Sequence, residues 1–220
     1  CVSACPTGAM QNQRFNDSVF MEFFQQFPVR PGITVVIGNE KQLQDLWWQQ
    51  RAGEKKDVLF LEYAEPQALS LFHFLHLIGQ GAARILLLMG DGDNTTSFGQ
   101  LEKINRTICS CLGADVAVQC CPINDYVQGL ERENVSNQPL TNKIFPHHSF
   151  LNRRKKVSEL LQHFALQNEK TILLSKEEHG AFASVVCDDS RCTQCFACLN
   201  ECKITALKAG PGAMSLTQDE

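Results

Sequence analysis

The sequence lacks several features that would place it in a common class. No apolar run is long enough to span a bilayer, and the first residues do not form a secretory signal pattern. The net charge of -4 provides no general positive field for nucleic acid or for an anionic membrane surface. Neither a P-loop nor a G-x-G-x-x-G phosphate fingerprint is present. We therefore expect no membrane span and no nucleic-acid partner.

Cysteine, in contrast, is abundant, with 11 residues in a chain of 220. The odd count argues against a closed disulfide framework, whereas reduced thiols that bind metal fit a reducing compartment. We expect a cytoplasmic protein. Because the first residue is Cys1 rather than Met, we also expect the sequence to begin inside a longer protein or after processing.

Four cysteines lie within one short stretch, at the spacing C-x2-C-x2-C-x3-C: Cys192, Cys195, Cys198 and Cys202. The first three can wrap one loop around a single inorganic cluster. Zinc sites typically use two separated pairs of ligands, so this spacing favours an iron–sulfur cluster over zinc. It is the spacing of a bacterial-type 4Fe–4S loop, and residues 180–220 resemble the ferredoxins that carry such loops.

The start of the chain resembles the end of the same motif. Cys1 and Cys5 are spaced C-x3-C, and Pro6 follows the second of them as in the ferredoxin pattern. We therefore expect three regions, namely the tail of one ferredoxin-like motif at 1–14, an α/β domain at 15–178 and the first half of another ferredoxin-like module at 179–220. The whole is expected to be a fragment of a larger multi-cluster protein.

The resemblance implies which cysteines share a cluster. In two-cluster ferredoxins the fourth cysteine of one motif serves the other cluster. The first three cysteines of the C-terminal motif would then hold one 4Fe–4S cluster, while Cys202 reaches a neighbouring one. Either Cys5 completes the first cluster, or a loop after Glu220 does so and the N-terminal pair serves a separate module. The hairpin-like pattern of 204–220 favours the second arrangement, in which this chain alone would hold incomplete clusters. Lys203 stands where the pattern usually has Pro.

The long middle region predicts an α/β domain. Short apolar runs at 33–37, 58–61, 85–89, 115–119 and 171–174 alternate with helical patterns. Such alternation is typical of a parallel sheet covered on both faces, so we expect a Rossmann-like or flavodoxin-like fold of about five strands. Helices are expected at 15–27, where Asp17 or Ser18 caps a run of core phenylalanines, and at 149–167. Leu43, Leu46 and Trp47 recur at helical spacing between the first two strands.

Other polar groups have ordinary structural interpretations. The loop 90–97 lies where α/β sheets bind ligands, but it matches no phosphate or calcium motif and is expected to cap a helix. His73 and His76 are expected to be core histidines. The basic run 153–156 is expected to be a solvated helix face rather than a docking patch for an acidic partner.

A second group of cysteines, Cys109, Cys111, Cys120 and Cys121, lies within the α/β domain. The stretch from Gly79 to Cys121 resembles the delta subunit of methyl-viologen-reducing hydrogenases, an electron-transfer domain with its own cluster cysteines. That family's first cysteines have no counterpart at 62–65, so we expect these four thiols to pack as small apolar side chains.

The sequence as a whole predicts an iron–sulfur protein that passes single electrons to or from a partner oxidoreductase, with no residue assigned a catalytic role. Two alternatives remain open. One is a catalytic redox subunit whose α/β domain binds a flavin or a nucleotide, and the other is a redox-sensing or scaffold domain.

Overall fold

The structure is a computed structural model that describes residues 11, 16–49, 57–90, 95–114, 117–126, 152–174, 190–193, 195, 197–201, 207–209 and 216–218. The chain divides into two compact units, Cys1–Leu174 and Ser175–Glu220. The division lies close to the boundary expected at 178.

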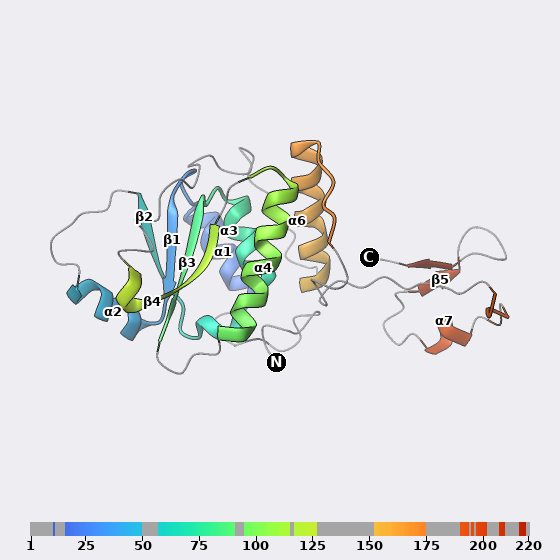
Figure 1. The fold of residues 1–220 in the computed structure, drawn as a ribbon, viewed down its shortest axis with the longest axis horizontal. Helices are drawn as coiled ribbons and strands as arrows, with labels where there is room; N and C mark the ends of the chain where they lie inside the picture. The colour runs from blue at the N-terminus through green and yellow to red at the C-terminus, as the bar shows by residue number, and fades with distance from the viewer. Residues whose placement is uncertain are drawn as a thin grey trace. The chain divides into compact units, whose positions relative to one another are not determined.

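A parallel sheet of four strands forms the centre of the first unit (Figure 1). The order is β2-β1-β3-β4, with β1 (Thr34–Gly38), β2 (Val58–Glu62), β3 (Arg84–Met89) and β4 (Ala117–Pro122). In the register, Val36 lies opposite Phe60 of β2 and Leu86 of β3. Every residue of β3 is buried, as expected for a central strand with both faces covered. The predicted α/β class is confirmed, and the strand order is that of flavodoxin-like sheets.

The fifth strand predicted at 171–174 is wrong, because this segment pairs with none of the described strands. It follows a helix that ends at Asn168, after which Glu169 adopts a left-handed conformation with φ of 51°. Leu173 is 74% exposed, and its carbonyl accepts a hydrogen bond from Cys111 Sγ at 3.6 Å. A short apolar run alone does not distinguish a buried strand from an exposed connecting segment.

Helices cover both faces of the sheet. They are α1 (Asp17–Gln26), α2 (Glu40–Gln49), α3 (Leu71–Gly79), α4 (Thr95–Cys111) and α6 (Arg153–Asn168), with short 3₁₀ turns η1 (Pro66–Ala68) and η2 (Ile123–Asp125). Figure 1 shows α2 to the left of the sheet and α3, α4 and α6 together to its right. The connection from β1 to β2 runs toward one edge of the sheet, whereas the connections from β2 to β3 and from β3 to β4 run toward the other edge. Right-handed crossovers therefore place α2 on one face of the sheet and α3 and α4 on the opposite face.

The face of the sheet beneath α2 carries a compact apolar cluster. Its buried members are Val36, Leu46, Leu86, Leu88, Cys121 and Tyr126. Tyr126 follows η2 and is fully buried between α2 and the strands. The strand residues of this cluster alternate with those that face the other helices, as the two-residue period of a strand dictates.

The opposite face is covered by α3, which is buried along almost its whole length. A Cβ atom on Gly79 would lie only 3.3 Å from the ring of Phe164 on α6. Glycine at this position therefore allows α3 and α6 to pack closely.

The phenylalanine-rich helix α1 has two different faces. Phe20 and Phe24 are buried, and the Phe20 ring meets the His73 ring edge-on with centroids 4.8 Å apart. Phe23 and Phe27 are 44% and 61% exposed. The expectation that the whole run packs in the core is therefore right for one face only. The N-terminal cap is Asn16, whose side chain accepts from Val19 N–H, rather than the predicted Asp17 or Ser18.

The second unit contains a short helix and a hairpin. The helix α7 (Ala197–Glu201) lies inside the cysteine motif, and β5 (Leu207–Ala209) pairs antiparallel with β6 (Leu216–Gln218). The predicted hairpin is confirmed in these strands.

Candidate metal centre

Three of the four cysteines in the C-terminal motif are described, and all three are exposed and free of disulfides. Cys192 follows a turn at Ser190–Arg191, and Cys198 lies in the first turn of α7. Within the described residues, no three His, Cys, Asp or Glu side chains lie close enough together to hold a metal ion. Cys202, and Cys1 and Cys5 of the N-terminal pair, lie outside the described residues.

Cys195 has surroundings that suit a metal-binding sulfur. The backbone N–H of Ala197 and the Thr193 side chain hydrogen-bond to its sulfur and lower the pKa of the thiol. The thiolate is the form that binds metal, and hydrogen bonds to cysteine sulfur are among the interactions that set the potential of an iron–sulfur cluster. Thiolate sulfur is a ligand for soft metal ions, including those of iron–sulfur clusters.

The cysteines of the α/β unit do not form a second site. Cys121 belongs to the apolar cluster under α2, whereas the next residue back, Cys120, points to the other face and lies near Glu102 of α4. Burial, helped by the charge of Glu102, raises the pKa of Cys120 to about 12, so its thiol stays neutral at ordinary pH. Cys109 is buried and Cys111 bonds to the Leu173 carbonyl. The sheet lies between Cys121 and the other three thiols. Cys109 and Cys121 are buried, as expected for small apolar side chains, whereas Cys111 and Cys120 are only partly buried.

The carboxyl ends of β1 and β3 form the point where strand order reverses, the usual ligand position in such sheets. Here Asn39 and Gln42 bond to each other, with Asn39 Oδ1 accepting from Gln42 N–H at 2.9 Å and Gln42 Oε1 accepting from Asn39 N–H at 2.8 Å. The Gln42 amide also donates to the Leu88 carbonyl at 3.3 Å. The backbone N–H groups of Asn39 and Gln42 are consequently not available to a phosphate. Residues 91–94 of the second loop lie outside the described residues.

A buried charge network joins the helices on the other face. Arg153 donates two hydrogen bonds to Asp17, from Nε to Oδ2 at 3.0 Å and from a terminal nitrogen to Oδ1 at 2.6 Å. His73 Nε2 lies 3.5 Å from the same carboxylate, and its Nδ1 accepts from Ser70 N–H at 3.0 Å. The expectation of a core histidine is confirmed. The expectation of a solvated basic run is wrong for two of its members, since Arg153 and Lys156 are each 5% exposed.

This network is structural rather than catalytic. Ser70, His73 and Asp17 follow one another in space as in a hydrolase triad, but each is at most 3% exposed. A nucleophile must reach its substrate, and the Asp17 carboxylate is already held by the Arg153 guanidinium. The arrangement ties α1, α3 and α6 together.

Burial lowers the pKa of His73 from 6.5 to about 3. The folded protein therefore keeps a neutral imidazole at pH values where the unfolded chain binds a proton. Because the unfolded state binds more protons below its pKa of 6.5, stability falls as the pH falls through this value. We expect His73 alone to lower the free energy of unfolding by about 2 kcal/mol between about pH 7 and pH 5.

Urea unfolding followed by circular dichroism at several pH values measures this effect. In the His73→Gln variant the free energy of unfolding should fall by about 2 kcal/mol less between about pH 7 and pH 5 than it does in the unaltered protein, whatever the variant's stability at neutral pH. An unchanged pH dependence would assign the effect to another group.

None of the helices in the described part of the chain combines the length and the apolar character that a bilayer span requires. Comparisons with protein-family models, with curated proteins and with solved structures find no significant match to this chain.

Proposed function

We propose that this protein is an electron carrier that binds 4Fe–4S clusters and exchanges single electrons with a partner oxidoreductase. The spacing of Cys192, Cys195, Cys198 and Cys202 carries the proposal. A bound cluster supplies one-electron redox chemistry. The residues of the chain supply the thiolates that hold it, and the donors around Cys195 favour that thiolate form.

Exposure of the loop supports exchange with another protein. Cys192, Cys195 and Cys198 all lie at the surface of their unit, so a cluster bound there would sit close to a docked partner. Thiolates that must stay reduced to bind metal require a reducing compartment, which supports a cytoplasmic location.

The alternative of a flavin or nucleotide site rests on the strand order alone. The reciprocal bonds between Asn39 and Gln42 occupy donors at the start of α2, where a phosphate would be expected to bind. The electron-carrier proposal is therefore favoured over it.

Anaerobic reconstitution of the whole chain with ferrous iron, sulfide and 2-mercaptoethanol tests the proposal, because the small thiol can fill any ligand position that the chain leaves open. We expect iron and acid-labile sulfide to bind in about equal amounts, as in a 4Fe–4S cluster, and dithionite to produce a paramagnetic signal. Retention of zinc with no iron and sulfide would refute the proposal. Co-purified flavin would instead promote the alternative.

A further inference from the structure

Two adjacent tryptophans lie on the surface of α2. Trp47 is 74% exposed and Trp48 is 61% exposed, and Phe60 on the neighbouring strand β2 is 48% exposed. Buried aromatic side chains contribute much of the binding energy at protein interfaces, and clustered exposed apolar groups commonly mark such interfaces. This surface of α2 and β2, which we call the α2–β2 surface, therefore has the composition of a binding site.

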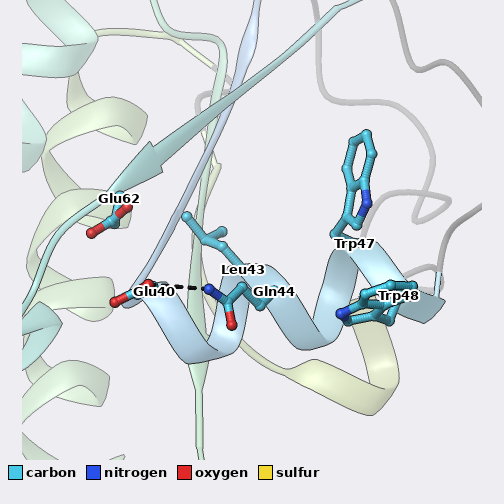
Figure 2. A pocket seen from close by; sticks show the side chains of 6 residues that line it. All are labelled: Glu40, Leu43, Gln44, Trp47, Trp48 and Glu62. Atoms are coloured by element: carbon cyan, nitrogen blue, oxygen red, sulfur yellow. Dashed lines mark hydrogen bonds between the residues drawn. The ribbon is translucent and has the colours of Figure 1, made fainter.

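The α2–β2 surface is hollowed rather than flat. An open pocket of about 610 Å³ is lined by Glu40, Leu43, Gln44, Trp47, Trp48 and Glu62. Figure 2 shows the carboxylates of the two glutamates at one end of this pocket and the two indole rings at the other. The pocket thus offers an acidic end and an aromatic end to one ligand.

The acidic end of the pocket carries two carboxylates. Glu62 ends β2 and pairs in register with Gly38, two residues before Glu40, which brings the two carboxylates to the same edge of the sheet. Glu40 accepts one hydrogen bond, from Gln44 Nε2 at 3.1 Å. Within the described residues neither glutamate forms an ion pair. A cationic group is the complement of this pair of carboxylates.

The strand β2 adds a second kind of contact. Among the described strands it pairs only with β1, so its outer edge presents unpaired backbone groups. An extended peptide can hydrogen-bond to such an edge while its alternate side chains enter pockets on either side.

A second copy of this chain fits the surface poorly. In a two-fold dimer the same patch meets itself, and its pocket lining contains no basic side chain that could pair with Glu40 and Glu62 of the other copy. Covering two carboxylates without a cationic partner opposes association.

We infer that the α2–β2 surface binds an extended segment of a partner protein in which a basic residue has apolar residues two positions before and two positions after it. At this spacing all three side chains lie on the same face of the segment. A basic side chain of the segment bonds to Glu40 and Glu62, while its apolar neighbours cover Trp47, Trp48 and Phe60. This inference concerns the α/β unit and stands whether or not the chain binds a cluster.

Tryptophan fluorescence provides a direct test, because Trp47 and Trp48 are the two tryptophans of the chain and both lie in this surface. The probe is a capped pentapeptide, Val-Ser-Arg-Ser-Val, added to the whole chain without iron. We expect a saturable shift of the emission to shorter wavelength, as the indoles leave water. The same peptide with Glu in place of Arg should cause no shift.

Charge variants keep both fluorophores and leave the core untouched. Glu40→Gln together with Glu62→Gln should weaken binding of the Arg peptide at least tenfold, corresponding to about 1.4 kcal/mol. The matched control, Glu22→Gln with Glu169→Gln, changes two exposed carboxylates on other helices and should bind as the unaltered protein does.

Three results would overturn the inference. One is the absence of any shift with the Arg peptide, and another is an equal shift with the Glu peptide. The third is a dimer in sedimentation velocity that dissociates in the Trp47→Ala, Trp48→Ala variant, which would assign the surface to a second copy.

Discussion

Replacing Asp17 with Ala is expected to lower the free energy of unfolding by about 3–5 kcal/mol. The substitution removes the carboxylate that accepts hydrogen bonds from Nε and a terminal nitrogen of the Arg153 guanidinium. Removing one member of an ion pair whose other member is only 5% exposed costs far more than the lost hydrogen bonds alone. Because the pair joins α1 to α6, residues 136 positions apart, loss of it should loosen both helices.

Urea unfolding followed by circular dichroism measures this loss, and the chain contains a matched control. The pair between Arg106 and Glu102 on α4 is equally short at 2.6 Å, but its side chains are 73% and 24% exposed. Glu102→Gln should therefore cost about 0.5 kcal/mol or less. Equal costs for the two substitutions would show that Asp17 and Arg153 do not form a buried pair.

A double variant separates the charge from the packing. Asp17→Leu with Arg153→Met removes both charges and replaces them with apolar groups. Because buried ion pairs often contribute little relative to apolar residues of similar volume, the double variant should be clearly more stable than Asp17→Ala. If the double variant is no more stable than Asp17→Ala, the loss of stability comes from altered packing rather than from an unpaired charge.

Local patterns predict the sheet but not this pair. The apolar runs that became β1 and β3 are recognisable because both strands are buried, and the run at β2 is equally apolar although Phe60 is 48% exposed. Asp17 and Arg153 each follow an asparagine that caps a helix, Asn16 and Asn152. With only local spacing to use, the aspartate is read as a cap and the arginine as part of a solvated face. Nothing in the sequence links two positions so far apart.

The surface of α2 shows the same limit. Leu43, Leu46 and Trp47 recur at helical spacing, which predicts a common buried face. In the structure Leu46 is 2% exposed and packs under the helix, whereas Trp47 is 74% exposed. Adjacent positions on a helix are about 100° apart, so a leucine and the tryptophan after it cannot both face the same sheet. Such a surface becomes visible only when the helix is placed against its strands.

The cysteine motif is different, because its information is local. The three cysteines that we propose as ligands lie within one short stretch that ends in α7, so no distant partner is needed to recognise them. The remaining ligand of the proposed cluster is not local. The order of the sequence does not decide between Cys5 and a loop after Glu220 as the source of this ligand. Substitution of individual cysteines can show which of them bind the proposed cluster.

Changing Cys195 to Ala is expected to remove most of the iron that the reconstituted chain binds at this motif. Only two cysteines of the motif would then remain for this cluster, which are too few to hold it on the chain even when 2-mercaptoethanol occupies the open positions. Cys198→Ala should have the same effect. Cys202→Ala should leave this cluster in place, since the fourth cysteine of such a motif serves the neighbouring cluster. The control is Cys111→Ala, which removes a thiol that bonds to the Leu173 carbonyl on the α/β unit and should leave the iron content unchanged.

Iron and sulfide analysis after anaerobic reconstitution, with 2-mercaptoethanol present throughout, compares these variants on one scale. The informative quantity is the difference in iron content between the Cys195→Ala and Cys202→Ala variants, because each substitution removes one thiol from the same motif. If Cys202→Ala abolishes iron binding as completely as Cys195→Ala, all four cysteines bind one self-contained cluster and the shared arrangement is wrong. If instead Cys5→Ala also lowers the iron content, the N-terminal cysteine completes this cluster, and the α/β unit is an insertion between two parts of one ferredoxin-like site.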